Sequence, residues 1–100
     1  KNLVVIIDYN KIQSLDAVKK TINLEPISKK FKSFGCQVKS INGHNFDQIV
    51  KAINNKTSKP LVIIANTIKG KGVKFMENSI LWHYKPLNKE NYLKARNILK

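Results

Sequence analysis

The sequence is poor in cysteine, arginine and acidic residues. It has one cysteine, Cys36, one arginine, Arg96, and six acidic residues against nineteen basic ones. A single cysteine excludes a disulfide within the chain, fits a reducing, cytoplasmic compartment and suits a buried structural thiol. No apolar run approaches the length of a membrane span, so we expect no membrane partner.

The net charge of +13 is almost entirely due to lysine. Proteins that read bases or phosphates usually draw on arginine, whose guanidinium makes paired hydrogen bonds. The lysines are also scattered, with small groups at residues 19–20 and 29–32. We interpret them as a solvated basic surface and expect no nucleic acid partner, while a basic nucleic-acid-binding module stays open as an alternative of a different class.

The length bounds the domain organisation. One hundred residues with 42% hydrophobic content suffice for one small domain or a piece of one. The chain begins at Lys1, and a predicted strand starts almost at once. A buried strand seldom opens a complete domain, because one flank would be an exposed apolar edge. We therefore expect residues 1–100 to be a fragment whose upstream half is missing.

Residues 3–12 organise the chain. Five apolar residues ending at Ile7 predict a strand buried on both faces. The strand then breaks into Asp8, Tyr9 and Asn10. In an open parallel sheet, ligands bind just beyond the carboxyl ends of the strands, which makes this polar end a candidate site. The alternative is a simple turn, which Asp and Asn both favour.

Residues 46–53 carry the clearest helical pattern. Asn45 can cap this helix, and Gln48, three residues later, is at the position that a capping box requires. Its predicted apolar face consists of Phe46, Ile49, Val50 and Ile53. Two further strands are predicted at residues 37–41 and 61–65. Helices are predicted at residues 24–34, ended by Gly35, and at residues 88–100, where Tyr92, Ala95, Ile98 and Leu99 lie near one face. Residues 13–23 are predicted to form a loop with at most a short helical turn, and residues 75–82 a short helix or an ordered loop.

Strands that alternate with helices predict an α/β fold, a parallel sheet with flanking helices joined by right-handed crossovers. In that geometry all three strands end along the same edge of the sheet. Polar residues from distant segments should therefore converge there: Asp8 and Asn10, Asn42 and His44, and Asn66 and Lys69.

Two later segments could carry chemistry. Residues 69–72, Lys-Gly-Lys-Gly, follow a predicted strand, and their glycines allow the backbone to approach a phosphate; a flexible basic turn is the alternative. His83, between Trp82 and Tyr84, could shuttle a proton or donate to an anion, or belong to a surface-packed aromatic turn. No phosphate-binding P-loop, zinc spacing or hydrolase triad is present.

Taken together, these segments resemble transketolases. Residues 5–15, V-I-I-D-Y-N-K-I-Q-S-L, are similar to the second half of the thiamine diphosphate motif, and residues 41–44, I-N-G-H, to the family's I-D-G-H turn. Residues 67–72, T-I-K-G-K-G, and residues 73–87, ending M-E-N-S-I-L-W-H-Y-K-P-L, resemble the segment that follows. The chain is most similar to the N-terminal, diphosphate-binding subunit of split bacterial transketolases.

The resemblance implies a Rossmann-like thiamine diphosphate-binding domain, of which residues 1–100 are the C-terminal part. 1-Deoxyxylulose-5-phosphate synthases share I-x-G-H and K-G-K-G and remain an alternative, although D-Y-N-K-I-Q-S and L-W-H-Y favour transketolase. A relative that kept the fold and lost the cofactor is a further alternative. The G-D-G half of the motif, whose Asp is another metal ligand, is absent from the sequence, and Asp16 stands where glycine is expected.

The resemblance also implies residue roles. The Asn10 side-chain oxygen and the Ile12 backbone carbonyl would bind a divalent cation, usually Mg²⁺, with Ca²⁺ or Mn²⁺ as alternatives, and oxygen ligands suit such a cation. Lys69 would lie near the cofactor diphosphate. His83 would contact the diphosphate and the substrate side of the cofactor, as both a cofactor-binding and a catalytic residue.

The implied activity is the transfer of a two-carbon ketol unit between sugar phosphates, as in the pentose phosphate pathway. The implied partner is a C-terminal transketolase subunit or domain that carries the pyrimidine-binding half, in a homo- or hetero-oligomer such as a dimer. The glutamate that activates the aminopyrimidine lies on that partner. We therefore expect the 100-residue chain alone to be inactive.

Overall fold

The computed structural model describes residues 2–13 and 16–99. The chain divides into two compact units, one of Lys1–Tyr9 with Asn23–Thr67 and one of Asn10–Ile22 with Ile68–Lys100. Three residues of predicted segments lie outside the described residues: Ser14 and Leu15 of the cofactor motif, and Lys100 of the last helix.

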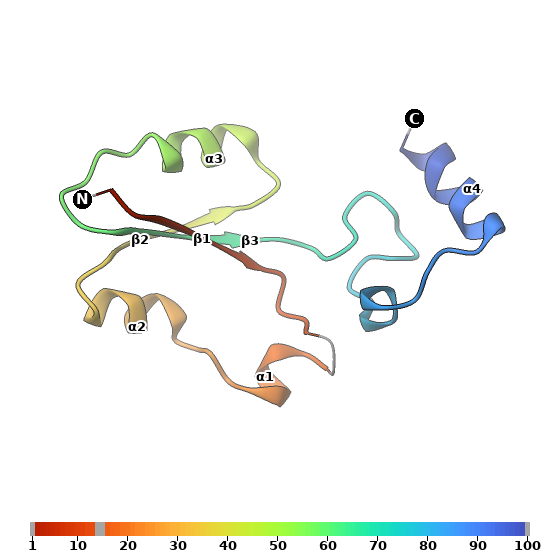
Figure 1. The fold of residues 1–100 in the computed structure, drawn as a ribbon, viewed down its shortest axis with the longest axis horizontal. Helices are drawn as coiled ribbons and strands as arrows, with labels where there is room; N and C mark the ends of the chain where they lie inside the picture. Colours follow the sequence, from red (N-terminus) through yellow and green to blue (C-terminus); the bar gives the residue numbers. More distant parts are fainter. Residues whose placement is uncertain (1, 14–15, 100) are drawn as a thin grey trace. The chain divides into compact units, whose positions relative to one another are not determined.

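A three-stranded parallel sheet forms the centre of the first unit (Figure 1). Its strands are β1 (Val4–Tyr9), β2 (Gln37–Asn42) and β3 (Leu61–Asn66), in the order β1-β3-β2. The register aligns their carboxyl ends, so that Tyr9 and Asn42 both pair with Asn66. The predicted α/β fold, with its strand ends along one edge of a parallel sheet, is confirmed.

Helices α2 (Ile27–Ser33) and α3 (Phe46–Ile53) pack on opposite faces of this sheet (Figure 1). The first core cluster joins Ile27 of α2 to Tyr9, Val62 and Ile64, and the second joins Ala52 of α3 to Leu61 and Ile63. Because β3 has a strand on each side and a helix on each face, Leu61 to Ala65 are all buried. The burial on both faces expected of a central strand therefore belongs to β3.

The prediction that the first strand is buried on both faces is wrong for β1. The side chains of Val4 and Ile6 are 47% and 57% exposed. Among the described residues β1 pairs only with β3, and the core cluster of α3 reaches Ile41 of β2 but no residue of β1. A run of five apolar residues predicts a strand, whereas its burial depends on which elements pack against it.

Helix α3 begins and ends as predicted, with a different apolar face. Asn45 caps it by accepting the Gln48 backbone N–H at 2.9 Å. The Gln48 side chain accepts from the Asn42 N–H at 2.8 Å and so links α3 to β2 instead of completing the capping box. Ala52 packs on the sheet, while Phe46 is 83% exposed and Val50 is exposed with it. The face next to Ala52 is the buried one; of the predicted face Ile49 is half-buried, and the other three side chains are exposed.

The second unit contains short elements and long turns. These are α1 (Val18–Thr21), the 3-10 helix η1 (Ile80–His83) and α4 (Lys89–Ile98). Helix α1 is the short helical turn expected within residues 13–23. Asn88 caps α4 through the Asn91 N–H at 2.8 Å, but only Ala95 of its predicted apolar face is buried. No helix in the described part of the chain is long and apolar enough to cross a membrane.

Candidate functional site

The turn after β1 holds two of the predicted site residues in a defined arrangement. The Asn10 side-chain oxygen, Oδ1, accepts the Ile12 backbone N–H at 2.9 Å. Lys11 between them has a φ of 64°, and its carbonyl accepts the Val18 N–H at 2.9 Å. Both Asn10 and Ile12 are half-buried. Asn is well suited to this role because its side chain hydrogen-bonds the backbone two residues on.

The far side of this turn is fixed by Asp16. Its carboxylate accepts the Ala17 N–H at 2.6 Å and forms an ion pair with Lys20 at 3.4 Å. The hydrogen bond from the Ala17 backbone, with help from the Lys20 charge, lowers the pKa of Asp16 below its ordinary value. Asp16 is therefore a carboxylate that stabilises the start of α1, in the place where the family resemblance led us to expect glycine.

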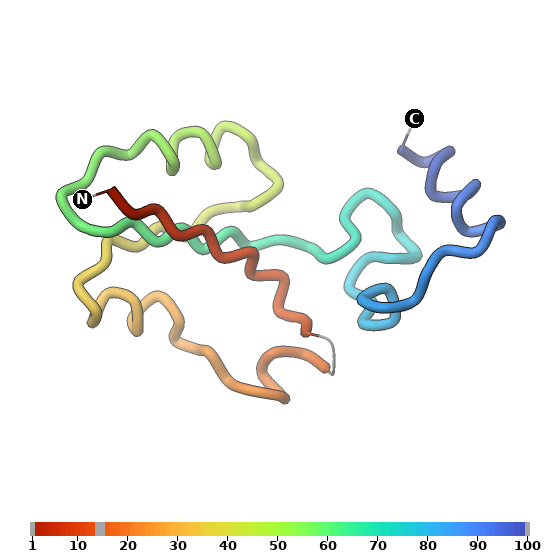
Figure 2. Tube along the Cα trace, viewed as in Figure 1, coloured from red at the N-terminus to blue at the C-terminus, as the bar shows by residue number. Residues whose placement is uncertain are grey.

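The segment after β3 places Lys69 at the base of a closed loop. The Asn78 backbone N–H donates to the Lys69 carbonyl at 3.0 Å, so the chain returns to its starting point over residues 69–78 (Figure 2). The Lys69 side chain is half-buried. The backbone hydrogen bond closes the loop on itself within the second unit.

His83 ends the 3-10 helix η1 and is exposed. The neighbouring Trp82 donates its indole N–H to the Phe75 carbonyl at 3.0 Å and packs edge-to-face on the Phe75 ring, with centroids 5.6 Å apart. Lys85 lies over the Trp82 ring at 5.8 Å. The Trp82 ring therefore packs η1 against Phe75, while His83 is exposed.

All four predicted site residues, Asn10, Ile12, Lys69 and His83, fall in the second unit. Apart from the bond between Asn10 and Ile12, no hydrogen bond or ion pair joins them to one another within the described residues. The described residues also contain no group of three or more His, Cys, Asp or Glu side chains that could hold a metal. A metal here would therefore rely on neutral oxygen atoms and on ligands from elsewhere.

The other strand-end residues act within the first unit. Asp8 accepts a hydrogen bond from the Thr67 hydroxyl and thereby ties the end of β1 to the end of β3. The His44 N–H donates to the Asn42 side-chain oxygen at 2.9 Å, as expected of a turn. Asn66 donates to the Ser40 hydroxyl at 2.9 Å. These contacts give Asp8 and Asn66 structural roles at the edge of the sheet.

Tyr9 has a partner that no sequence pattern indicates. Its hydroxyl donates to Glu25 Oε1 at 2.6 Å, and Glu25 Oε2 accepts the Ile27 N–H at 3.2 Å. The hydrogen bond to Glu25, together with burial, raises the pKa of Tyr9. Sixteen residues separate the pair, so no local spacing signals it. The contact anchors the start of α2 to the end of β1.

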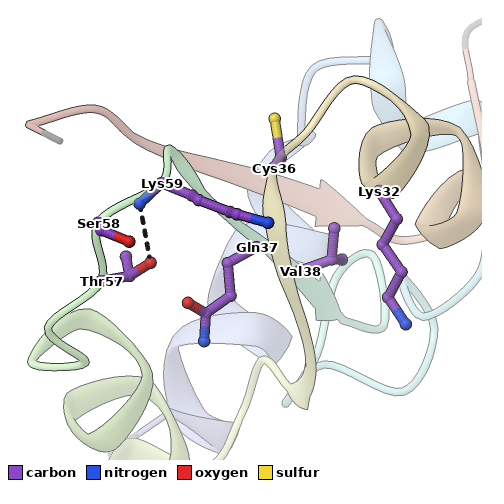
Figure 3. A pocket seen from close by; sticks show the side chains of 7 residues that line it. All are labelled: Lys32, Cys36, Gln37, Val38, Thr57, Ser58 and Lys59. Carbon is purple, nitrogen blue, oxygen red and sulfur yellow. Dashed lines mark hydrogen bonds between the residues drawn. The ribbon is translucent and has the colours of Figure 1, made fainter.

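A cavity of 480 Å³ opens at the other end of the sheet (Figure 3). Gln37 begins β2 there, and the Lys59 N–H donates to the Thr57 hydroxyl at 3.1 Å just before β3. The cavity contains none of the four predicted site residues. Its lining residues are Lys32, Cys36, Gln37, Val38, Thr57, Ser58 and Lys59.

The described residues form an α/β fold, and comparison with known proteins identifies the class of protein. The whole chain, residues 1–100, matches the family described as transketolase, thiamine diphosphate binding domain. A 6-deoxy-6-sulfo-D-fructose transketolase subunit from a Clostridium species is 42% identical over 98 residues, which cover 94% of this chain and 35% of that protein.

Two further relatives agree. An apulose-4-phosphate transketolase subunit from Actinobacillus succinogenes is 36% identical over 86 residues, or 84% of this chain and 31% of that protein. The crystal structure of transketolase from Campylobacter jejuni matches with a TM-score of 0.88 and 37% identity over 96% of this chain and 15% of that one. This chain therefore belongs to the transketolase thiamine diphosphate-binding domain family. It spans about a third of the length of the subunits it matches.

Proposed function

We propose that this chain is part of a thiamine diphosphate- and divalent-metal-dependent transketolase that moves a two-carbon ketol unit between sugar phosphates. The observation that carries the proposal is the match to this family over the whole chain, together with the gathering of Asn10, Ile12, Lys69 and His83 in one compact unit. In the proposed assignment, residues 1–100 form the later part of the diphosphate-binding domain.

In this proposal Asn10 and Ile12 bind the metal. Asn10 Oδ1 uses one lone pair on the Ile12 N–H and keeps a second for a cation, and the Ile12 carbonyl lies in the same turn. Oxygen atoms of this kind suit Mg²⁺, Ca²⁺ and Mn²⁺. Two neutral ligands do not complete the shell of Mg²⁺, which takes about six oxygen atoms in near-octahedral geometry. The remaining ligands would come from the cofactor diphosphate, from water and from an acidic residue outside this sequence.

Lys69 and His83 would balance the charge of the diphosphate. The half-buried Lys69 ammonium attracts phosphate oxygen atoms, and the exposed His83 imidazole can donate a hydrogen bond to a phosphate or to the substrate. When bound, the thiazolium of the cofactor supplies the electron sink for carbon–carbon bond chemistry. This chain then has the tasks of orienting the diphosphate, neutralising it and offering a proton donor at His83.

The proposed partner is a second polypeptide or domain that carries the pyrimidine-binding half. The relatives from Clostridium and Actinobacillus are both named as subunits of a transketolase, which supports a divided enzyme and a hetero-oligomer. We propose a cytoplasmic location, in keeping with the free thiol of the half-buried Cys36. The 100-residue chain by itself should transfer no ketol unit, and turnover above background would refute that part of the proposal.

The binding of thiamine diphosphate with Mg²⁺ to the whole protein tests the assignment. Asn10→Ala should weaken cofactor binding by roughly 100-fold, since loss of a metal ligand leaves the diphosphate with fewer anchors. Lys69→Ala should weaken it by about tenfold, the usual effect of losing one charge-assisted contact. Isothermal titration of each variant measures both effects.

Two exposed residues of the same unit serve as matched controls. Asn97→Ala in α4 removes an asparagine, and Lys74→Ala in the loop after β3 removes a lysine. Both should bind the cofactor as the unmodified protein does. If Asn10→Ala and Lys69→Ala bind as tightly as these controls, the proposed cofactor site is wrong.

A further inference from the structure

The loop at residues 69–79 contains an acidic residue that the proposed function leaves unexplained. Glu77 is the only acidic residue between Asp47 and Glu90, in a stretch that carries eight lysines. A carboxylate close to a site for a diphosphate should oppose binding through like-charge repulsion. Its presence in this loop therefore calls for a structural reason.

Hydrogen bonds show what Glu77 does within the loop. Its Oε1 accepts the Gly72 backbone N–H at 3.1 Å and lies 3.9 Å from the Lys71 ammonium. Its own backbone N–H donates to the Val73 carbonyl at 3.1 Å. The Glu77 side chain is only 27% exposed, so it lies against the loop. The Glu77 carboxylate thus links the later part of the loop to Lys71 and Gly72 in its earlier part.

The base of the loop is closed just beside this contact. The Asn78 N–H donates to the Lys69 carbonyl at 3.0 Å, and Gly70 passes so close to the chain that an added Cβ would lie 2.6 Å from the Met76 carbonyl oxygen. Gly70 also has a φ of +74°. These features hold the backbone at Lys69 in a single close-packed arrangement.

The same loop is joined to the element that carries His83. Phe75 lies within the loop, and its carbonyl accepts the Trp82 indole N–H at 3.0 Å while the two rings meet edge-to-face. His83 is the next residue after Trp82. Contacts that hold the loop in place therefore also hold both residues proposed to contact the diphosphate: Lys69 at the start of the loop and His83 beyond its end.

From these contacts we propose that Glu77 is a positioning residue, whose carboxylate holds loop 69–79 closed and thereby presents Lys69 and His83 to the cofactor diphosphate. The inference rests on the proposed function. Glu77 also pairs with Lys71, while Lys69 forms no ion pair in the described part of the chain. The arrangement makes Lys69, and not its neighbour two residues on, the cation left for the phosphate.

The sign of one effect separates positioning from simple electrostatics. If Glu77 acts only through its charge, removing it takes away a repulsion and the whole protein should bind thiamine diphosphate more tightly. If Glu77 positions the loop, Glu77→Ala should bind it about tenfold more weakly at a fixed Mg²⁺ concentration, because the Gly72 N–H loses its acceptor. Glu77→Gln keeps an acceptor at that place and should stay within about threefold of the unmodified protein.

A readout that needs no cofactor tests the loop itself. Hydrogen exchange of the peptide covering residues 69–83, in the protein without cofactor, should be about tenfold faster in Glu77→Ala and nearly unchanged in Glu77→Gln. Glu90→Gln is the matched control, because Glu90 pairs with Lys94 at 2.6 Å within α4 and is not part of the loop. It should alter neither the exchange nor the affinity.

The outcomes are distinguishable. Tighter or unchanged binding by Glu77→Ala overturns this inference, and equal weakening by Glu77→Gln and Glu77→Ala overturns it as well, since the hydrogen bond would then be irrelevant. If Glu77→Ala does not fold, the affinity of Glu77→Gln decides: binding of thiamine diphosphate clearly tighter than by Glu90→Gln would show that Glu77 acts through its charge alone, and would overturn the inference. If Lys69→Ala binds the cofactor normally, it is the proposed function that fails.

Discussion

The two units of the chain differ in the interactions that stabilise each of them internally. In the first unit β3 supplies a continuous buried strand, with Leu61, Val62 and Ile63 each 1% exposed. In the second unit Val73 and Ala95 are the only buried residues in the described part of the chain, and turns, caps and side-chain hydrogen bonds maintain the rest. Every proposed site residue belongs to this second unit. The sheet therefore provides stability, and the turns that follow its strands carry the proposed chemistry.

The largest expected effect is on the core of the sheet. Ile63→Ala should lower the free energy of unfolding of the whole protein by about 2–5 kcal/mol, because it leaves a cavity between β3 and α3. Ile22→Ala in the second unit, where the side chain is 64% exposed, should cost less than about 0.5 kcal/mol. Urea denaturation measures both values. Similar losses for the two variants would show that the units do not differ as described.

Each unit contains a glycine with positive φ, and the cost of replacing it with alanine can be compared between the units. Gly35 follows α2 with a φ of +79° and open space around it, so Gly35→Ala should cost about 1–2 kcal/mol for the backbone conformation alone. Gly70→Ala has the same cost plus the clash with the Met76 carbonyl. It should destabilise the protein more and also accelerate hydrogen exchange in loop 69–79. Equal effects would mean that the close approach at Gly70 is unimportant.

Removing the helix caps should cost less free energy, by the same amount for each cap, but one loss should affect global unfolding and the other only its own helix. Asn45→Ala and Asn88→Ala each remove one side-chain acceptor, worth about 1 kcal/mol. We expect Asn45→Ala to lower the midpoint of global unfolding, because α3 covers the core. Asn88→Ala should mainly accelerate hydrogen exchange of the first amides of α4. A global shift of the same size from Asn88→Ala would argue that α4 unfolds together with the sheet.

The smallest expected effect is a pH dependence at the boundary of the first unit. The hydrogen bond to Glu25 raises the pKa of Tyr9 above its ordinary value of 10.0, so this stabilisation is complete below pH 10.0 and is lost as the pH rises through the raised pKa. Tyr9→Phe should therefore flatten the fall in stability above pH 10.0. Tyr92→Phe, at an exposed position in α4, should leave that fall unchanged.

The sequence predicted the regular elements of the sheet well, for a physical reason. Apolar runs and helical periodicity report a choice of local conformation, and the bounds of β2, β3, α2 and α3 agree with the predicted ranges to within three residues. They do not report which neighbours cover a strand, and this is why β1 proved half-exposed on the face where Val4 and Ile6 lie. The same limit applies to α3, where Ala52 is buried and Phe46 is exposed.

The candidate site was predictable where it depends on topology. A parallel sheet brings the ends of its strands to one edge, and the alternation of strands and helices in the sequence was enough to single out the residues after β1 and after β3. Contacts across loops could not be predicted in this way. Glu77 on Gly72 and Tyr9 on Glu25 depend on the path of turns whose dihedral angles follow no repeating pattern.

The strand order has a consequence for how the protein is made. β3 lies between β1 and β2 but comes last in the chain, and residue 61 pairs with both residue 4 and residue 37. During synthesis, β1 and β2 therefore leave the ribosome before the strand that lies between them, and these three strands can pair only after residues 61–66 have emerged. Such long-range pairing slows folding and leaves apolar strands exposed for longer. We expect the newly made chain to need protection from aggregation until β3 is available.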